Sequence, residues 1–442
     1  MLTVLAFAMV IAFMALIMTK RLSPLIALIL VPIAFGIIGG FTTKLGPMML
    51  EGIRTLAPTG VMLMFAILYF GIMIDAGLFE PFVQRIVRLV HGDPMKIVVG
   101  TAVLALLVSL DGDGSTTYMI TTAAMLPLYR RLGIRPLILA CVTMLSSGVM
   151  NILPWGGPSA RAASALQIDV AQIFVPMIPA MGVAACWVLF VAYRLGIRER
   201  ARLSGPGSHD LPDTPEIEPE PELPLVDASI RRPDRLRVNA LLTALLMIAL
   251  VLGAMPLPVL FMIGFAIAML INYPSLTEQK ARLHAHAGNI LAVVGLIFAA
   301  GIFTGILSGT KMVDAMAESV IRATPDALGP YLAIVTAALS VPFTFFISND
   351  AFYFGVLPIL AKAGAAYGVT AAEMGRASVV GQPVHLLSPL VPSTYLLVGL
   401  VEVDFDDHQR FTLKWALGTA LVLLLVGVAT AAVPVVGRTL AR

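Results

Sequence analysis

The sequence predicts an all-α polytopic membrane protein made of two inverted repeats. Hydrophobic residues make up 59% of the 442 residues and charged residues only 12%, a composition unlike that of water-soluble domains. Several apolar stretches are long enough to cross a hydrocarbon layer of roughly 30 Å. They cover residues 2–19, 238–252 continuing to 271, 290–307 and 415–436. The third observation is that the two halves of the chain resemble each other.

The resemblance between the halves appears at an offset of 231 residues. The matched pairs are Pro127 with Pro358, Gly133 with Gly364, Ser147 with Ser378, and Pro158 with Pro389. Their surroundings match in hydropathy, which favours a duplication. Positive residues near helix ends favour the cytoplasm, and they place the two copies in opposite orientations. Inverted repeats of this kind build many secondary transporters, whose site lies near the middle of the bilayer.

A polar segment separates the two repeats. Arginine clusters at residues 194–202 and 231–237 flank a stretch rich in Pro and Glu, residues 204–229. Such a composition is typical of a disordered linker, and the flanking arginines predict that it is cytoplasmic. We therefore expect a first repeat at residues 1–195, a linker at 196–236 and a second repeat at 237–442.

The first polar segment at membrane depth is SLDGDGSTT, within a re-entrant hairpin expected over residues 97–129. Polar groups are costly in lipid, so they mark buried or water-lined sites. The candidates for metal or proton coupling are Asp111 and Asp113, and those for substrate binding are Ser115, Thr116 and Thr117. A helix that starts at the tip would direct its dipole at a carboxylate. The alternative is an interfacial loop with solvated aspartates.

The second hairpin is expected over residues 330–362, with its polar tip at Ser348, Asn349 and Asp350. Ser348 and Asn349 are candidates for substrate binding, and Asp350 for metal or proton coupling. The tip could also be the N-cap of an ordinary helix, which is compatible with the hairpin.

A broken helix follows each hairpin, because Pro cannot continue a regular helix. The first is expected over residues 136–160, and its substrate-binding candidates are Asn151, Gly156, Gly157, Ser159 and Arg161. The guanidinium of Arg161 suits a carboxylate, although the side chain could instead extend to the membrane surface.

The second broken helix is expected over residues 372–397 and supplies Gln382, His385 and Ser388 as substrate-binding candidates. His385 is also a candidate proton carrier, with a neutral ring bonded to a backbone carbonyl as the alternative.

These polar groups indicate the class of cargo. Carboxylate and hydroxyl oxygens suit Mg²⁺ or Ca²⁺, whereas Arg161 and helix dipoles suit an oxyanion. Together they predict a metal–carboxylate complex as the cargo. No zinc-protease or serine-hydrolase motif occurs, so we expect a transporter and not an enzyme, with no prosthetic group and no nucleic-acid partner. Cys141 and Cys186 lie in apolar segments and are expected to be free, buried thiols.

At these motifs the sequence resembles the citrate–metal–proton symporter family, CitMHS, of the ion transporter superfamily. The matching strings include GDPMKIVVGTAVLALLVSLDGDGSTTYMITTAAMLPLY, SSGVMNILPWGGPSARAASAL, FISNDAFYFGVLPIL and GQPVHLLSPLVPSTYLLVGL. The resemblance extends over the chain except for the linker. It implies import of citrate bound to a divalent cation, driven by protons, across a bacterial inner membrane. Another organic anion without metal, such as gluconate or a dicarboxylate, remains the alternative.

The resemblance also implies a homodimer in which each chain has a scaffold and an elevator-like transport domain. The Ser-Asn-Thr signature of superfamily relatives is only partly present: Ser348 and Asn349 match it, but Asp350 takes the third place. The first copy has Asp113 to Thr116 instead. This departure favours protons or metal in place of sodium.

Overall fold

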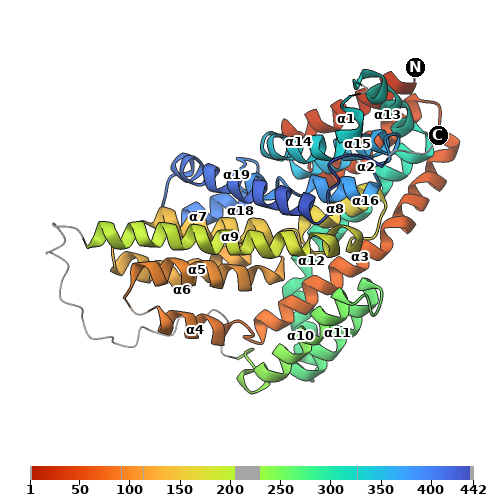
Figure 1. The fold of residues 1–442 in the computed structure, drawn as a ribbon. Helices are drawn as coiled ribbons and strands as arrows, with labels where there is room; N and C mark the ends of the chain where they lie inside the picture. The colour runs from red at the N-terminus through yellow and green to blue at the C-terminus, as the bar shows by residue number, and fades with distance from the viewer. Residues whose placement is uncertain (1, 91, 113, 205–228, 326, 439–442) are drawn as a thin grey trace.

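The protein is helical throughout the part that the computed structural model describes, which comprises residues 2–90, 92–112, 114–204, 229–325 and 327–438 (Figure 1). The all-α class expected from the sequence is therefore confirmed. Asp113 and almost all of the expected linker stretch, residues 204–229, lie outside these ranges.

Six helices among the described residues are long and apolar enough to cross a membrane. They are α3 (Leu45–Asp75), α5 with its 3₁₀ extension (Pro94–Asp111), α9 (Ala171–Leu203), α12 (Leu276–Gly309), α14 with its preceding turn (Gly329–Phe346) and α19 (Phe405–Ala429). The chain is thus a multi-pass membrane protein.

Shorter helices fill the spaces between these six. In the first half they are α1 (Leu2–Met18), α2 (Pro24–Ile38), α4 (Glu80–Leu89), α6 (Gly114–Arg131), α7 (Pro136–Met150) and α8 (Gly157–Leu166). In the second half they are α10 (Leu236–Val251), α11 (Leu257–Asn272), α13 (Met312–Ala323), the π-helix η5 (Ala351–Val356), α15 (Leu357–Ala365), α16 (Ala371–Ser378), α17 (Gln382–His385) and α18 (Pro392–Val401).

The helices pack into two groups, each drawn from both halves of the chain. We call α1–α3 and α10–α13 the frame helices, and α5–α9 with α14–α19 the site helices; the short α4 packs on α5 and α6. Within the site helices, α9 packs against α5 and α19, and the three run side by side in Figure 1. Within the frame helices, α3 packs most extensively against α12 and α11. The two groups meet chiefly where α13 lies on α15 and α8 on α12.

Glycines allow the two longest frame helices to cross closely. A Cβ atom at Gly52 of α3 would lie 1.9 Å from the carbonyl oxygen of Gly301 of α12, and one at Gly305 would lie 2.3 Å from the carbonyl oxygen of Met48. Small residues at such contacts let membrane helices approach backbone to backbone. Any side chain at Gly52 would force α3 and α12 apart.

Left-handed residues recur at matching places in the two halves. They are Lys20 and Gly253, Gly77 and Lys311, Gly133 and Gly368, and Gln167 and Glu402. The members of each pair are 233 to 235 residues apart. The sequence comparison at 231 residues paired Gly133 with Gly364, which differs by about one helical turn. An ungapped comparison cannot detect the few residues by which the second half is longer.

Two segment boundaries differ from the sequence-based expectation. The helix α9 continues to Leu203, past the expected boundary at 195, because the buried carboxylate of Glu199 accepts hydrogen bonds from Arg135 and Arg202. The apolar stretch 238–271 is split into α10 and α11 by a turn with Gly253 in the left-handed region.

The two cysteines of the chain are free. Cys141 is buried, as expected, but Cys186 is exposed on α9. The expectation of burial was therefore wrong for Cys186, because this position of an apolar membrane helix faces outward from the bundle.

Candidate functional site

The break in the first broken helix lies between α7 and α8. The chain leaves α7 after Met150 and enters α8 at Gly157, and the segment between them is tightly folded. A Cβ atom at Gly156 would lie 2.2 Å from the carbonyl oxygen of Asn151. The hydroxyl of Ser159 donates to the carbonyl oxygen of Ile152 at 2.8 Å, so the start of α8 is tied back to the break.

The second broken helix has the same construction. The short helix α17 ends at His385 and α18 begins at Pro392. The hydroxyl of Thr394, in the first turn of α18, donates to the carbonyl oxygen of Leu386. Each break is therefore closed by a hydroxyl near the start of the following helix, which satisfies a carbonyl that lost its helical partner.

The first tip, residues 109–116, joins α5 to α6. Asp111 is 7% exposed, and Gly112 is left-handed with a φ of 78°. A Cβ atom at Gly114 would lie 3.8 Å from both the Ser147 hydroxyl on α7 and the Ser393 hydroxyl on α18. The first tip thus lies between α7 of the first half and α18 of the second.

The second tip, residues 347–350, contributes to a cluster of side-chain amides around the buried Gln382. Gln382 is fully buried, and its Nε2 donates to the hydroxyl of Tyr353 at 2.9 Å. The Gln382 amide also exchanges long hydrogen bonds with Asn349 at 3.4 and 3.5 Å. Asn151 Nδ2 donates to Gln382 Oε1 at 3.4 Å, so residues of both halves meet at one amide.

An ion pair joins the two halves beside this cluster. Arg161 Nε donates to Asp350 Oδ1 at 2.6 Å, and the two side chains are only 24% and 12% exposed. The guanidinium of Arg161 thus binds a carboxylate of the protein itself. Removing both charges from bulk water costs free energy that only close pairing offsets.

Several expected site residues are instead hydrogen-bonded to other groups of the protein. Ring atom Nδ1 of His385 lies 2.6 Å from the carbonyl oxygen of Thr344, the arrangement of the neutral alternative. The hydroxyl of Ser388 donates to the carbonyl oxygen of Phe345 at 2.6 Å. The buried Thr117 donates to the Ser109 hydroxyl at 3.1 Å. These contacts hold the tips and breaks in shape.

The remaining expected residues are partly accessible and are better placed to meet a cargo. They are Ser115, Thr116, Asn151, Gly157, Ser348 and Asn349. They come from the two tips and the first break; the break contacts the first tip through Trp155 and meets the second tip at Gln382.

Two residues that the sequence analysis did not single out also belong to this site. Tyr353 orients Gln382, and its hydroxyl donates to the carbonyl oxygen of Ser378 at 3.3 Å. Trp155 donates from Nε1 to the carbonyl oxygen of Leu110 at 2.9 Å. Trp155 could have been found from the sequence, because a tryptophan stands there between Pro and Gly residues of a helix break. Tyr353 could not, because it is one of several aromatic residues in an apolar helix.

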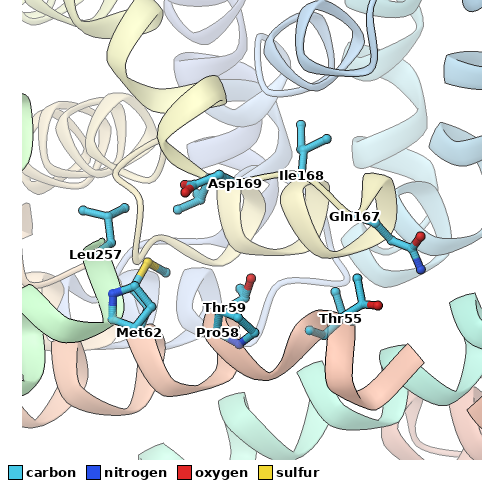
Figure 2. A pocket seen from close by; sticks show the side chains of 11 residues that line it. Thr55, Pro58, Thr59, Met62, Gln167, Ile168, Asp169 and Leu257 are labelled. Atoms are coloured by element: carbon cyan, nitrogen blue, oxygen red, sulfur yellow. The ribbon is translucent and has the colours of Figure 1, made fainter. Parts of the chain in front are cut away.

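Two cavities lie where frame helices meet site helices. The first, of about 240 Å³, is lined by Thr55 and Thr59 of α3, Asp169 of the α8–α9 connection, and Leu257 of α11 (Figure 2). The second, of about 360 Å³, lies between α8, α12, α13 and α15. None of the described residues that line either cavity belongs to the expected site.

The described residues contain no cluster of three or more His, Cys, Asp or Glu side chains that could hold a metal ion. A metal carried as part of the cargo needs fewer protein ligands, because the carboxylates of the cargo supply the others.

Comparison with known proteins identifies the family. The sequence model of the citrate transporter family, CitMHS, matches residues 6–381. The chain belongs to the citrate transporter family. The chain is 60% identical to a citrate transporter of Bacillus subtilis over 97% of its own length and 99% of the relative. It is 53% identical to a Mg(2+)/citrate complex secondary transporter of the same organism, over 98% of its length and the whole relative.

Solved transporter structures share the fold of this citrate transporter family member. The YdaH transporter of Alcanivorax borkumensis aligns with a TM-score of 0.63 at 17% identity, over 92% of this chain and 91% of that one. MtrF of Neisseria gonorrhoeae aligns with a TM-score of 0.57 at 13% identity, over 91% and 86%. At these identities the likeness concerns the fold alone.

Proposed function

We propose that the protein imports citrate complexed with a divalent metal ion, in symport with protons, across a bacterial inner membrane. The observation that carries this proposal is the ion pair of Arg161 and Asp350, set between two broken helices at the amide cluster. The name of the Mg(2+)/citrate transporting relative supports the choice of cargo.

Charge balance at the ion pair explains how a proton could accompany the cargo. Without cargo, Asp350 offsets the charge of Arg161. Citrate with three ionised carboxylates and one divalent metal carries a single negative charge. If a proton neutralises Asp350, Arg161 is free to bind that anion, and its charge is again offset. Loading therefore leaves the net charge of the site unchanged, whereas an added unpaired charge would be costly to move through a membrane interior.

The metal of the cargo would meet oxygen atoms of the first tip. We assign this role to Asp111 and Asp113, and we assign citrate contacts to Ser115, Thr116, Asn151, Gly156, Gly157, Arg161, Ser348, Asn349 and Gln382. Ser159, His385 and Ser388 would support the site through their contacts with backbone carbonyls, and Thr117 through its contact with the Ser109 hydroxyl. Asp350 is engaged by a guanidinium, which favours a proton over a metal ion at its carboxylate.

We further propose that the two halves are inverted repeats and that the site helices move against the frame helices. The matching left-handed residues and the two matching breaks support the repeat. The cavities at the boundary between the two groups support movement there. In this arrangement the linker is cytoplasmic, and the frame helices form the interface of a homodimer.

Transport of another organic anion without metal is the second candidate, because Arg161 can neutralise a carboxylate without any metal once Asp350 is protonated. Uptake of radiolabelled citrate into proteoliposomes tests both. We expect uptake only with Mg²⁺, Ca²⁺ or a similar ion, and its loss when an uncoupler dissipates the pH gradient. Metal-independent uptake, or uptake of gluconate that excess metal–citrate does not inhibit, would favour the second candidate.

A further inference from the structure

Trp155 connects the site helices to the frame helices. It lies in the break between α7 and α8 and is 5% exposed. The centroid of its ring system is 5.0 Å from that of Phe70 on α3 and 5.1 Å from that of Phe261 on α11. Both partners belong to the frame, and they also contact each other.

The same indole also contacts the first tip. Trp155 Nε1 donates to the carbonyl oxygen of Leu110 at 2.9 Å. A Cβ atom at Gly112 would lie 2.5 Å from Trp155 Cδ1, so only glycine leaves room for the ring. The left-handed φ of 78° at Gly112 also favours glycine. Trp155 therefore contacts both the backbone beside Asp111 and the frame.

The second break has no such contact among the described residues. Trp155 precedes the left-handed Gln167 by twelve residues, and Leu390 precedes the left-handed Glu402 by the same number. Leu390 is 38% exposed, and Phe346 beside the second tip is 69% exposed. One break is thus docked on the frame through an aromatic cluster, and the equivalent break is not.

We propose that Trp155 is a positioning residue that couples occupancy of the first tip to movement of the site helices along the frame. This inference rests on the proposed transport function. A cargo bound at the first tip changes the backbone at Leu110 and Gly112, and the indole that contacts both must adjust. Its ring contacts with Phe70 and Phe261 then weaken, which releases the site helices from the frame.

The indole itself can report this release. The chain has three tryptophans, so the double substitution Trp187→Phe and Trp415→Phe leaves Trp155 as the sole indole. A docked indole is shielded from water, and an undocked one is not. We expect citrate plus Mg²⁺ to shift the emission of Trp155 to longer wavelength and to raise its quenching by acrylamide about twofold, as the population moves to the undocked state.

Substitutions of Trp155 separate its two contacts. Trp155→Phe keeps an aromatic ring but loses the hydrogen-bond donor to the carbonyl oxygen of Leu110. We expect the KM for citrate to rise about tenfold, which corresponds to the loss of one hydrogen bond worth about 1.4 kcal/mol. Trp155→Leu also loses the stacking, and we expect a lower maximal rate as well. The matched control is Trp187→Phe, which removes an indole stacked on Phe190 at 5.6 Å within α9, and there we expect unchanged uptake.

The inference is overturned if the emission and quenching of Trp155 are unchanged by citrate plus Mg²⁺ while the double variant still takes up citrate. Unaltered KM and maximal rate in both Trp155 variants would overturn it as well. Because the fluorescence measurement uses the native Trp155, it remains decisive even if Trp155→Leu fails to fold. Absence of citrate uptake by the unsubstituted protein would instead refute the proposed function.

Discussion

Replacing Asp350 by Asn tests the proposed coupling most directly. The substitution keeps the size of the side chain and removes the charge that offsets Arg161. Removing one partner of a buried ion pair costs about 3–5 kcal/mol. Because the side chains of Arg161 and Asp350 are still 24% and 12% exposed, we expect a loss of stability at the lower end of this range, about 3 kcal/mol. The melting temperature in detergent should therefore fall measurably.

The functional effect should differ between two modes of transport. In Asp350→Asn the empty site carries an uncompensated positive charge, whose movement through the membrane interior is costly. Net uptake should therefore fail, whereas counterflow of labelled against unlabelled metal–citrate should persist, because the bound cargo offsets the charge of Arg161. Calorimetry in buffers of different ionisation enthalpy should show proton uptake on binding fall from about one to none.

A second acidic residue provides the control. Asp314 of α13 pairs with Lys362 of α15 at 3.0 Å, but these side chains are 45% and 57% exposed. Such pairs contribute about 0–1 kcal/mol, so Asp314→Asn should leave stability and proton uptake close to those of the unsubstituted protein. If Asp350→Asn binds cargo with undiminished proton uptake and still accumulates citrate, the assignment of the proton to Asp350 is refuted.

Three further predictions concern packing, hydrogen bonding and pH. Gly148→Ala places a Cβ atom 2.9 Å from the α17 backbone; it should cost about 1–3 kcal/mol of stability and abolish uptake. Gly182→Ala on α9 has open space and should leave stability and uptake unchanged. Melting curves and uptake assays of the two variants test this, and equal behaviour of the two would contradict it. Gln382→Ala removes the hydrogen bonds to Tyr353, Asn349 and Asn151 and should cost about 1–3 kcal/mol, with a higher KM for citrate. An unchanged KM would remove Gln382 from the site. Burial raises the pKa of Asp93 at the start of α5, but hydrogen bonds from Arg200 and the backbone outweigh this and keep the pKa below the ordinary 3.8. A lowered pKa stabilises the fold above the ordinary value and loses that effect as pH falls through the folded-state pKa. Asp93→Asn should therefore lower the melting temperature at neutral pH but not near pH 2, and equal differences at both would contradict this.

The sequence identified the polar segments because their signals are local. Proline and glycine interrupt a helix wherever they occur in its interior, and charge is rare at membrane depth for energetic reasons. The breaks at residues 151–156 and 386–391 and the tip at Ser348 to Asp350 therefore needed no knowledge of long-range contacts. Hydropathy predicted in the same way that the chain spans the membrane.

The partners of these segments could not be read from the sequence. Asp350 and Arg161 are 189 residues apart, and either could have paired with water, lipid or another side chain. His385 and Ser388 carry polar groups that suit a cargo, but both are occupied by backbone carbonyls. Which polar atoms bind each other depends on distances set by the packing of α7, α8, α14 and α17, not on residue type.

What the sequence determined by itself was therefore the membrane-embedded class, the family, and the places where helices are interrupted, because composition and local backbone chemistry are sufficient for these. The tertiary structure alone decided that Arg161 is neutralised by Asp350 and that Trp155 docks on the frame. Both contacts join segments that are brought together only when the two halves pack, and packing sums many weak interactions that no single motif encodes.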